Sequence, residues 1–246
     1  MGRRHLALAF WLSLSVPAAA LAQEGTVRGK VEVTAKGADG QPAPAADASG
    51  VVVYLTGFTQ DPSDEVPVVR QRFKSFVLPD GRGGSFRALP ITKGQSVDFV
   101  NDDVELHNVF STSKIREFDL GKKGPKDREK IRFSQAGVVD IFCDIHEQMT
   151  MTILVLPNRA FAITGKDGSF EIKGVPPGTH EVRAWVRWAE LPNPVKVTAG
   201  QAEPVVLKLV QTKPDESHKD KRGQPYSTHK DAYQKLIQSQ PKPGTP

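Results

Sequence analysis

Short segments that alternate apolar and polar residues, separated by glycine- and proline-rich turns, fill most of this chain and restrict it to a β fold. Between Gln23 and Val210 no stretch places apolar residues at the spacing of an amphipathic helix. Stretches such as VRGKVEV and SFEIKGV alternate with a period of two, which is typical of strands buried on one face. Turn signals, including Asp167-Gly168, separate these stretches from their neighbours. We therefore expect an all-β protein built from β-sandwiches.

Residues 1–22 have the pattern of a secretory signal peptide. Two arginines precede the apolar run 6–16, and the sequence ALAQ supplies a small-x-small cleavage site before Gln23. This apolar run is too short to cross a bilayer, and no later apolar run reaches the roughly 18 residues that a spanning helix requires. We expect a mature protein without a membrane span, periplasmic or secreted after cleavage before Gln23.

The charge balance argues against nucleic acid as a partner. The chain carries 33 Lys and Arg against 28 Asp and Glu, which is a mild excess. No stripe of basic and aromatic residues of the kind that follows a phosphate backbone is found. Much of the positive charge lies in residues 212–246, where few apolar residues occur, so we expect a disordered tail there. One short helix is possible in that tail, at 228–238.

A single cysteine, Cys143, lies in the spacing Cys143-x-x-His146-x-x-Met149, between the strand stretches VVDIF and MTILVLP. An exported protein meets oxidants, and one thiol cannot form an internal disulfide, so Cys143 is either buried and inert or protected by a bound group. Two imidazoles, a thiolate and a weak axial thioether make a type 1 copper site. The second histidine is expected to be His107, because no other histidine lies within the strand series leading to this loop. Met151 is an alternative axial donor.

Other interpretations of these residues remain open at this point. Taken singly, the cysteine is a core residue, the histidine a surface residue and the methionine a packing residue. A zinc site would have no use for the thioether of Met149. A cysteine nucleophile would need an orienting partner, and an exported free thiolate would oxidise. We find no set of residues that predicts an enzyme. His180, His218 and His229 have no partner at ligand spacing and are expected to be surface residues.

The stretches KGQSVDFVNDD, HNVF and QAGVVDIFCDIHEQM together resemble the cupredoxin family, over roughly residues 66–157. The loop spacing is similar to that of the amicyanins. This resemblance implies a Greek-key β-sandwich with His107, Cys143 and His146 as equatorial copper ligands and Met149 as the axial ligand. It also implies that Asn108 ties the two ligand loops together by hydrogen bonds, although an ordinary loop asparagine is the alternative.

The flanking sequence resembles a second family, the carboxypeptidase regulatory-like domains, which are small transthyretin-like β-sandwiches. The turns DG-x-F and PPGT after residue 160 carry this resemblance, and the opening strands of such a domain lie far upstream. We therefore expect residues 24–60 and 158–211 to form one sandwich into which the cupredoxin unit is inserted. A tandem arrangement is the alternative. The combination resembles exported methylamine-utilisation-like proteins, and the second sandwich is expected to be a scaffold or docking module.

These observations predict an exported blue copper protein that carries single electrons between periplasmic redox partners. The resemblance implies that electrons pass through the edge of His146. A copper protein for storage, delivery or sensing and a purely structural β module are the alternatives. We expect a monomer, and the acidic residues before His107 together with Glu147 and Gln148 favour polar recognition of the redox partner.

Overall fold

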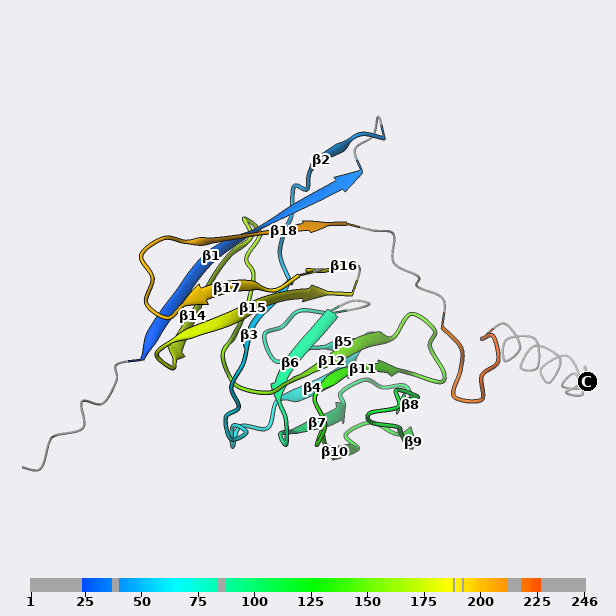
Figure 1. The fold of residues 1–246 in the computed structure, drawn as a ribbon. Helices are drawn as coiled ribbons and strands as arrows, with labels where there is room; N and C mark the ends of the chain where they lie inside the picture. Colours follow the sequence, from blue (N-terminus) through cyan, green and yellow to red (C-terminus); the bar gives the residue numbers. More distant parts are fainter. Residues whose placement is uncertain are drawn as a thin grey trace, which may run out of the picture.

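The computed structural model describes residues 24–36, 40–83, 87–187, 189–191, 193–211 and 218–226. Every regular element in these ranges is a β-strand, so the prediction of an all-β protein is confirmed (Figure 1). The expected signal peptide and the possible helix at 228–238 lie outside the described residues. No helix long and apolar enough to cross a membrane is found in the described part of the chain.

The strands form two sandwiches, and the smaller one combines the beginning and the end of the described chain. Its two sheets share a core that includes Val27, Leu55, Ile172 and Leu207. The first sheet contains β14 (Ser169–Val175), β1 (Gly25–Lys36), β18 (Val205–Val210) and β2 (Pro42–Pro44). The second contains β13 (Phe161–Ile163), β3 (Val52–Thr56), β15 (Thr179–Val186), β16 (Ala189–Glu190) and β17 (Val195–Thr198).

The larger sandwich is formed by the chain between β3 and β13. One of its sheets contains β10 (Arg128–Arg132), β7 (Ser96–Asn101), β4 (Val68–Arg72) and β5 (Ser75–Val77). The other contains β6 (Arg87–Thr92), β12 (Thr150–Leu156), β11 (Gly137–Phe142), β8 (His107–Ser111) and β9 (Phe118–Lys123). Phe76, Phe99, Ile141 and Ile153 fill the core between these sheets.

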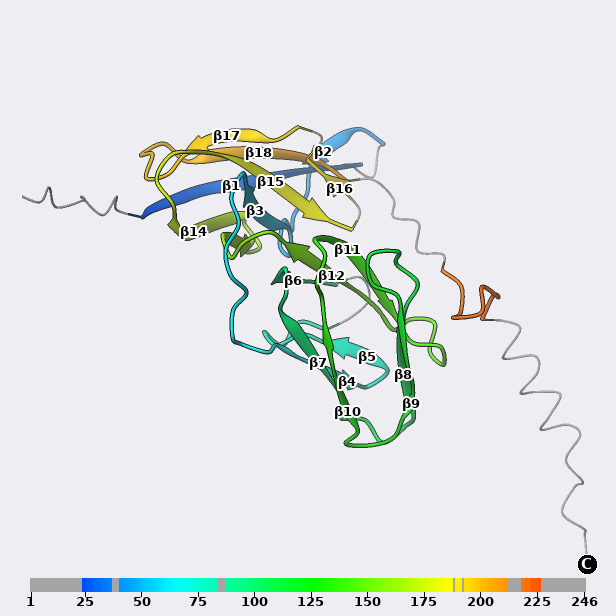
Figure 2. The same ribbon diagram turned by 60° about the horizontal axis from the view of Figure 1, so that its bottom comes forward.

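Strand β12 is buried on both faces, because it separates two apolar clusters. Its residues Ile153 and Val155 point into the core of the larger sandwich. Leu154 and Leu156 point the other way and pack with Tyr54 and Trp185 of the smaller sandwich, in a third cluster between the two units. Figure 2 shows this arrangement, with β3 and β15 facing the sheet that contains β6 and β12. The sandwiches are therefore joined by apolar packing as well as by the chain.

The buried side chain of Asn158 links the two segments of chain that connect the sandwiches. Its Nδ2 donates hydrogen bonds to the carbonyl oxygens of Leu55 (3.1 Å) and Phe58 (3.0 Å). Its Oδ1 accepts a hydrogen bond from the N–H of Ala160 at 3.0 Å. The segment that leaves the smaller sandwich is thus bonded to the segment that returns to it.

Replacing Asn158 with leucine is expected to lower the free energy of unfolding by about 2–4 kcal/mol, because three buried backbone groups lose their partner. Urea denaturation followed by circular dichroism measures this change. Asn193, which is exposed, provides the control, and Asn193→Ala should unfold at the same urea concentration as the unmodified protein. If the Asn158 variant were as stable as the unmodified protein, these hydrogen bonds would not be holding the two connecting segments together.

Candidate metal centre

The topology of the larger sandwich brings two separate segments together at one end. His107 is the first residue of β8, and Cys143 follows the last residue of β11. These strands are neighbours, with Phe110 paired to Phe142. His146 lies in the loop that leads from β11 to β12. Three of the four residues expected from the sequence therefore lie side by side.

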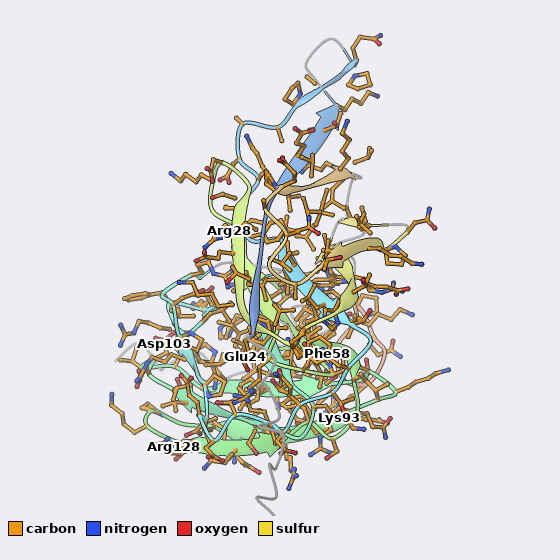
Figure 3. The ribbon with its side chains drawn as sticks, turned by 60° about the vertical axis from the view of Figure 1, so that its left-hand side comes forward. Glu24, Arg28, Phe58, Lys93, Asp103 and Arg128 are labelled. Carbon is orange, nitrogen blue, oxygen red and sulfur yellow. The ribbon has the colours of Figure 1, made fainter. Side chains whose placement is uncertain are left out.

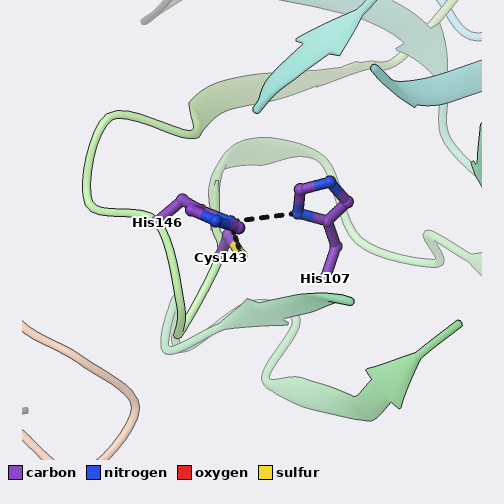
Figure 4. Close-up of side chains that lie close together, drawn as sticks. All are labelled: His107, Cys143 and His146. Atoms are coloured by element: carbon purple, nitrogen blue, oxygen red, sulfur yellow. Dashed lines mark hydrogen bonds between the residues drawn. The ribbon is translucent and has the colours of Figure 1, made fainter. Parts of the chain in front are cut away.

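The nitrogen and sulfur atoms of these three residues converge on one point (Figure 4). Nδ1 of His107 lies 3.1 Å from Nδ1 of His146, and Sγ of Cys143 lies 3.9 Å from the same His146 atom. All three ligand atoms lie within 4.8 Å of one another. Donors that share one metal ion at about 2.0–2.3 Å are themselves separated by about 3–4 Å, so this cluster has the size of a metal site.

The outer nitrogen of each imidazole is bonded to a carboxylate. Nε2 of His107 donates to Oδ2 of Asp103 at 3.1 Å, and Nε2 of His146 faces Oε2 of Glu105 at 3.3 Å. An ionised carboxylate only accepts hydrogen bonds, so both imidazoles carry their hydrogen on Nε2 when neutral. Each Nδ1 atom then presents a lone pair to the other. A cation between the two atoms would satisfy both lone pairs.

The pKa of His146 disfavours a proton as that cation. Burial, and next the neighbouring His107, lower the pKa of His146, which disfavours its protonated form. The backbone N–H of Lys74 and then the ring of His107 help to lower the pKa of Asp103 to about 2, so its carboxylate is ionised at neutral pH. Ion pairing with Lys74 similarly lowers the pKa of Glu105. The pKa of His146 is thus lowered even though the ionised Glu105 beside it acts in the opposite direction.

The sulfur of Cys143 is fully buried and accepts two backbone hydrogen bonds. The N–H groups of Asn108 and Ile145 each point at Sγ from 3.5 Å. Burial raises the pKa of the Cys143 thiol, and these two N–H groups oppose that rise. In the absence of a metal ion the thiol therefore keeps its proton. A metal ion would displace that proton and use the sulfur as a thiolate ligand.

Asn108 connects three segments around the sulfur. Its Nδ2 donates to Oδ1 of Asp119 (2.7 Å) and to the carbonyl of Gly121 (2.9 Å) in β9. Its Oδ1 accepts the N–H of Asp144 at 3.3 Å. Because its own N–H also reaches Cys143, Asn108 links strands β8 and β9 to the loop after β11. Such bonds fix the orientation of a ligand.

Met149 is fully buried in the same core cluster as Cys143. Its N–H donates to the carbonyl of His146 at 3.0 Å, and its own carbonyl accepts the N–H of Cys143 at 3.2 Å. These two bonds close the loop 143–149 on itself. Met151 is also buried and pairs with Ile141 within the sheet. The thioether of Met149 as axial donor stays a prediction.

The sequence does not predict a role in the site for the carboxylates of Asp103 and Glu105. The acidic run before His107 favours a polar partner surface, whereas two of its side chains contact the imidazoles. Figure 3 places Asp103 on the larger sandwich and Arg28 on the smaller one. The sequence signal for the role of these two carboxylates was an acidic cluster directly before an expected ligand.

Two of the remaining histidines lie outside the cluster in the described chain. His180 donates to the carbonyl of Pro176 at 2.8 Å and contacts the ring of Phe58. His218 stacks on Phe142, with 4.6 Å between the ring centroids. This stacking differs from the expectation of a surface histidine, and residues 218–226 as a group differ from the expectation of a disordered tail, since Tyr226 is only 4% exposed. His229 lies outside the described residues.

Comparison with known proteins gives likenesses in structure only. No protein-family model matches the chain, and no curated protein matches it. A purple cupredoxin from Nitrosopumilus maritimus is 27% identical over 28% of this chain and 77% of its own, with a TM-score of 0.27. A Cu(I) form of an amicyanin mutant is 16% identical over 42% of this chain and 98% of its own, with a TM-score of 0.32.

A third similar structure is the copper-containing nitrite reductase of Thermus scotoductus. It is 24% identical over 42% of this chain and 25% of its own, with a TM-score of 0.33. These scores are low, so the function proposed below rests on the donor atoms of this chain. The described residues form an all-β protein with a His–Cys–His cluster at one end of a sandwich.

Proposed function

We propose that this chain is a cupredoxin-like protein that binds one copper ion and carries single electrons. His107, Cys143 and His146 are the equatorial ligands in this proposal, and Met149 is the axial ligand. The observation that carries it is the convergence of two imidazole Nδ1 atoms, 3.1 Å apart, beside a buried thiol. A metal ion at the centre of these atoms would bind all three.

The chemistry of the donor set suits copper. Soft sulfur donors favour Cu(I), imidazoles bind both Cu(I) and Cu(II), and a long axial thioether is characteristic of electron-transfer copper sites. Zinc prefers a closed tetrahedral set and gains nothing from the thioether. When bound, copper supplies a one-electron couple between Cu(I) and Cu(II).

The protein contributes a rigid frame for that couple. Asn108 and the closed loop 143–149 hold the donors in position before a metal arrives, so little rearrangement accompanies a change of oxidation state. The side chain of His107 is fully buried, whereas that of His146 is 13% exposed. We therefore assign the electron path to His146, the one histidine ligand with exposed surface.

The surroundings of His146 support docking of a redox protein at this end. Ile145, Val104 and Leu106 are exposed apolar side chains next to His146 or to its partner Glu105 in the sequence. Val104 is 86% exposed, so its side chain is accessible to an approaching protein. The polar surface expected from Glu147 and Gln148 is thus complemented by apolar contacts.

The proposal also covers the division of the chain into two domains and the place where the protein acts. We assign residues 24–60 and 158–211 to a carboxypeptidase regulatory-like scaffold and residues 66–157 to the copper domain, and the shared core of Val27 and Leu207 supports this division. The protein is proposed to act as a monomer in the periplasm or outside the cell, after cleavage before Gln23. It is proposed to transfer electrons without catalysing a reaction.

The test is a titration of the purified mature protein with Cu(II), followed by visible absorption and voltammetry. One equivalent should produce an intense blue colour from thiolate-to-copper charge transfer, and one electron should bleach it reversibly. A colourless protein that binds copper would favour storage, delivery or sensing. A protein that binds none would leave a structural module.

Replacing Asp103 with asparagine or Glu105 with glutamine should raise the reduction potential of the copper-loaded protein, because each carboxylate stabilises Cu(II) more than Cu(I). One unit charge near the ligand shell corresponds to a shift on the order of 50 mV. Voltammetry measures the shift, and Asp64→Asn, at an exposed position, is the control for net charge alone. An equal shift in the control would contradict a role for contact with the imidazoles.

A further inference from the structure

Residues 218–226, which we call the C-terminal strap, lie against the loop that carries Cys143. In Figure 1 the strap is drawn in orange at the end of the described chain. It contacts Phe142, Cys143 and Asp144, which are three consecutive residues at the end of β11. A segment that begins 75 residues after Cys143 in the sequence is therefore in direct contact with the loop that carries it.

The strap holds the backbone of the cysteine ligand itself. The hydroxyl of Tyr226 donates a buried hydrogen bond to the carbonyl oxygen of Cys143 at 2.7 Å. The ring of His218 packs between Phe142 and Tyr226, with centroid distances of 4.6 and 5.2 Å. These contacts cover the residue before the ligand and fix the carbonyl of the ligand.

A second set of strap contacts holds the residue after the cysteine. The N–H of Lys221 donates to Oδ1 of Asp144 at 3.2 Å. Its Nζ lies 2.8 Å from Oδ2 of Asp119 and 3.9 Å from Oδ2 of Asp144. Asp119 and Asp144 are also partners of Asn108, so the strap extends the same network that reaches the sulfur.

The strap has a defined turn of its own. Oδ1 of the buried Asp220 accepts the N–H groups of Arg222 (2.8 Å) and Gln224 (2.7 Å). The N–H of Asp220 donates to the carbonyl of Gln224 at 2.9 Å, which closes the turn. Tyr226 and Lys221 are thus presented to the loop from a turn with internal bonds, which reduces the entropy lost on docking.

We propose that the strap is a positioning element that holds the Cys143 loop closed, with Tyr226 as its principal positioning residue. One consequence of this proposal, that the strap slows loss of the metal, rests on the copper function proposed above. Because Cys143 is fully buried, the loop 143–149 must open before Cys143 can release a metal ion or meet a reagent. The strap bonds two residues of the moving segment, so its contacts break when the loop opens.

The first test uses the metal-free full-length protein and the alkylation of Cys143, its only thiol, by iodoacetamide. Tyr226→Phe removes one hydroxyl and leaves a buried carbonyl without this donor, so alkylation should be roughly tenfold faster. Arg222→Gln, at an exposed position of the same strap, should react at the unmodified rate. Urea unfolding of each variant separates loop opening from a general loss of stability. Equal alkylation rates in Tyr226→Phe and the unmodified protein would overturn the proposal.

The second test measures transfer of copper from the loaded protein to a strong chelator. Tyr226→Phe and Lys221→Gln should each lose copper several-fold faster than the unmodified protein and the Arg222→Gln control. If the unmodified protein binds copper, and it and the three variants all lose copper at the same rate, the strap has no positioning role. If none of them binds copper while Tyr226→Phe is alkylated faster, the copper function is wrong and the strap still holds the loop.

Discussion

Replacing Cys143 with serine is expected to abolish the blue colour of the copper-loaded protein and to weaken copper binding by about a thousandfold or more, since loss of a ligand exceeds the roughly 10–100-fold effect of losing a residue that orients one. The colour depends on charge transfer from the thiolate, which serine cannot supply. The unmodified protein should also release one proton per copper bound near neutral pH, because burial keeps its thiol protonated. The serine variant should not release this proton.

Absorption spectra and calorimetry in two buffers of different ionisation enthalpy measure both effects. Met151→Leu is the matched control, because it replaces a buried sulfur residue of the same core with a side chain of similar volume. This control should stay blue and release its proton. A serine variant that remained blue would eliminate Cys143 as the ligand.

Asn108→Leu is expected to lower the free energy of unfolding by about 3 kcal/mol, because buried partners in β9 and in the Cys143 loop lose their hydrogen bonds. Copper affinity should fall roughly 10–100-fold as the two ligand segments lose their link. The substituted residue keeps its backbone N–H, so the sulfur retains both of its backbone donors. The expected result is therefore a weaker site that is still blue.

Urea denaturation of the metal-free protein and copper titration measure the two effects separately. Ser111 lies on the same strand, is buried and accepts one hydrogen bond, from Ser113 at 3.2 Å. Ser111→Ala should therefore lose some stability while keeping its copper affinity. If Asn108→Leu lost stability but bound copper as tightly as this control, its side chain would not be positioning the ligands.

The β architecture was predictable because its signal is local. Strands such as β14 and β18 alternate buried and exposed residues along the chain, and this period is visible in the sequence alone. The proximity of Cys143 and His146 was predictable for the same reason, since three residues separate them. The proximity of His107 to these two residues was predictable only with one further inference, that the ends of neighbouring strands in a sandwich meet at one edge.

The contacts that the sequence did not reveal all depend on the path of the backbone. Nothing in the run before His107 shows that Asp103 and Glu105 turn back toward two different imidazoles. The strap was expected to be disordered because it has few apolar residues. It is held instead by Tyr226 and His218, whose partners at Cys143 and Phe142 are remote in sequence.

The chain emerges from its N-terminus during synthesis, so the sequence order of the strands sets the order in which the two sandwiches can fold. The larger sandwich is formed by one continuous stretch, so it can fold as soon as β12 has emerged. The smaller sandwich pairs β1 with β14 and β18, so it must wait for nearly the whole chain. Tyr226 emerges later still. The metal-binding end is therefore assembled before its supporting sandwich, and the contact that holds the cysteine loop forms last.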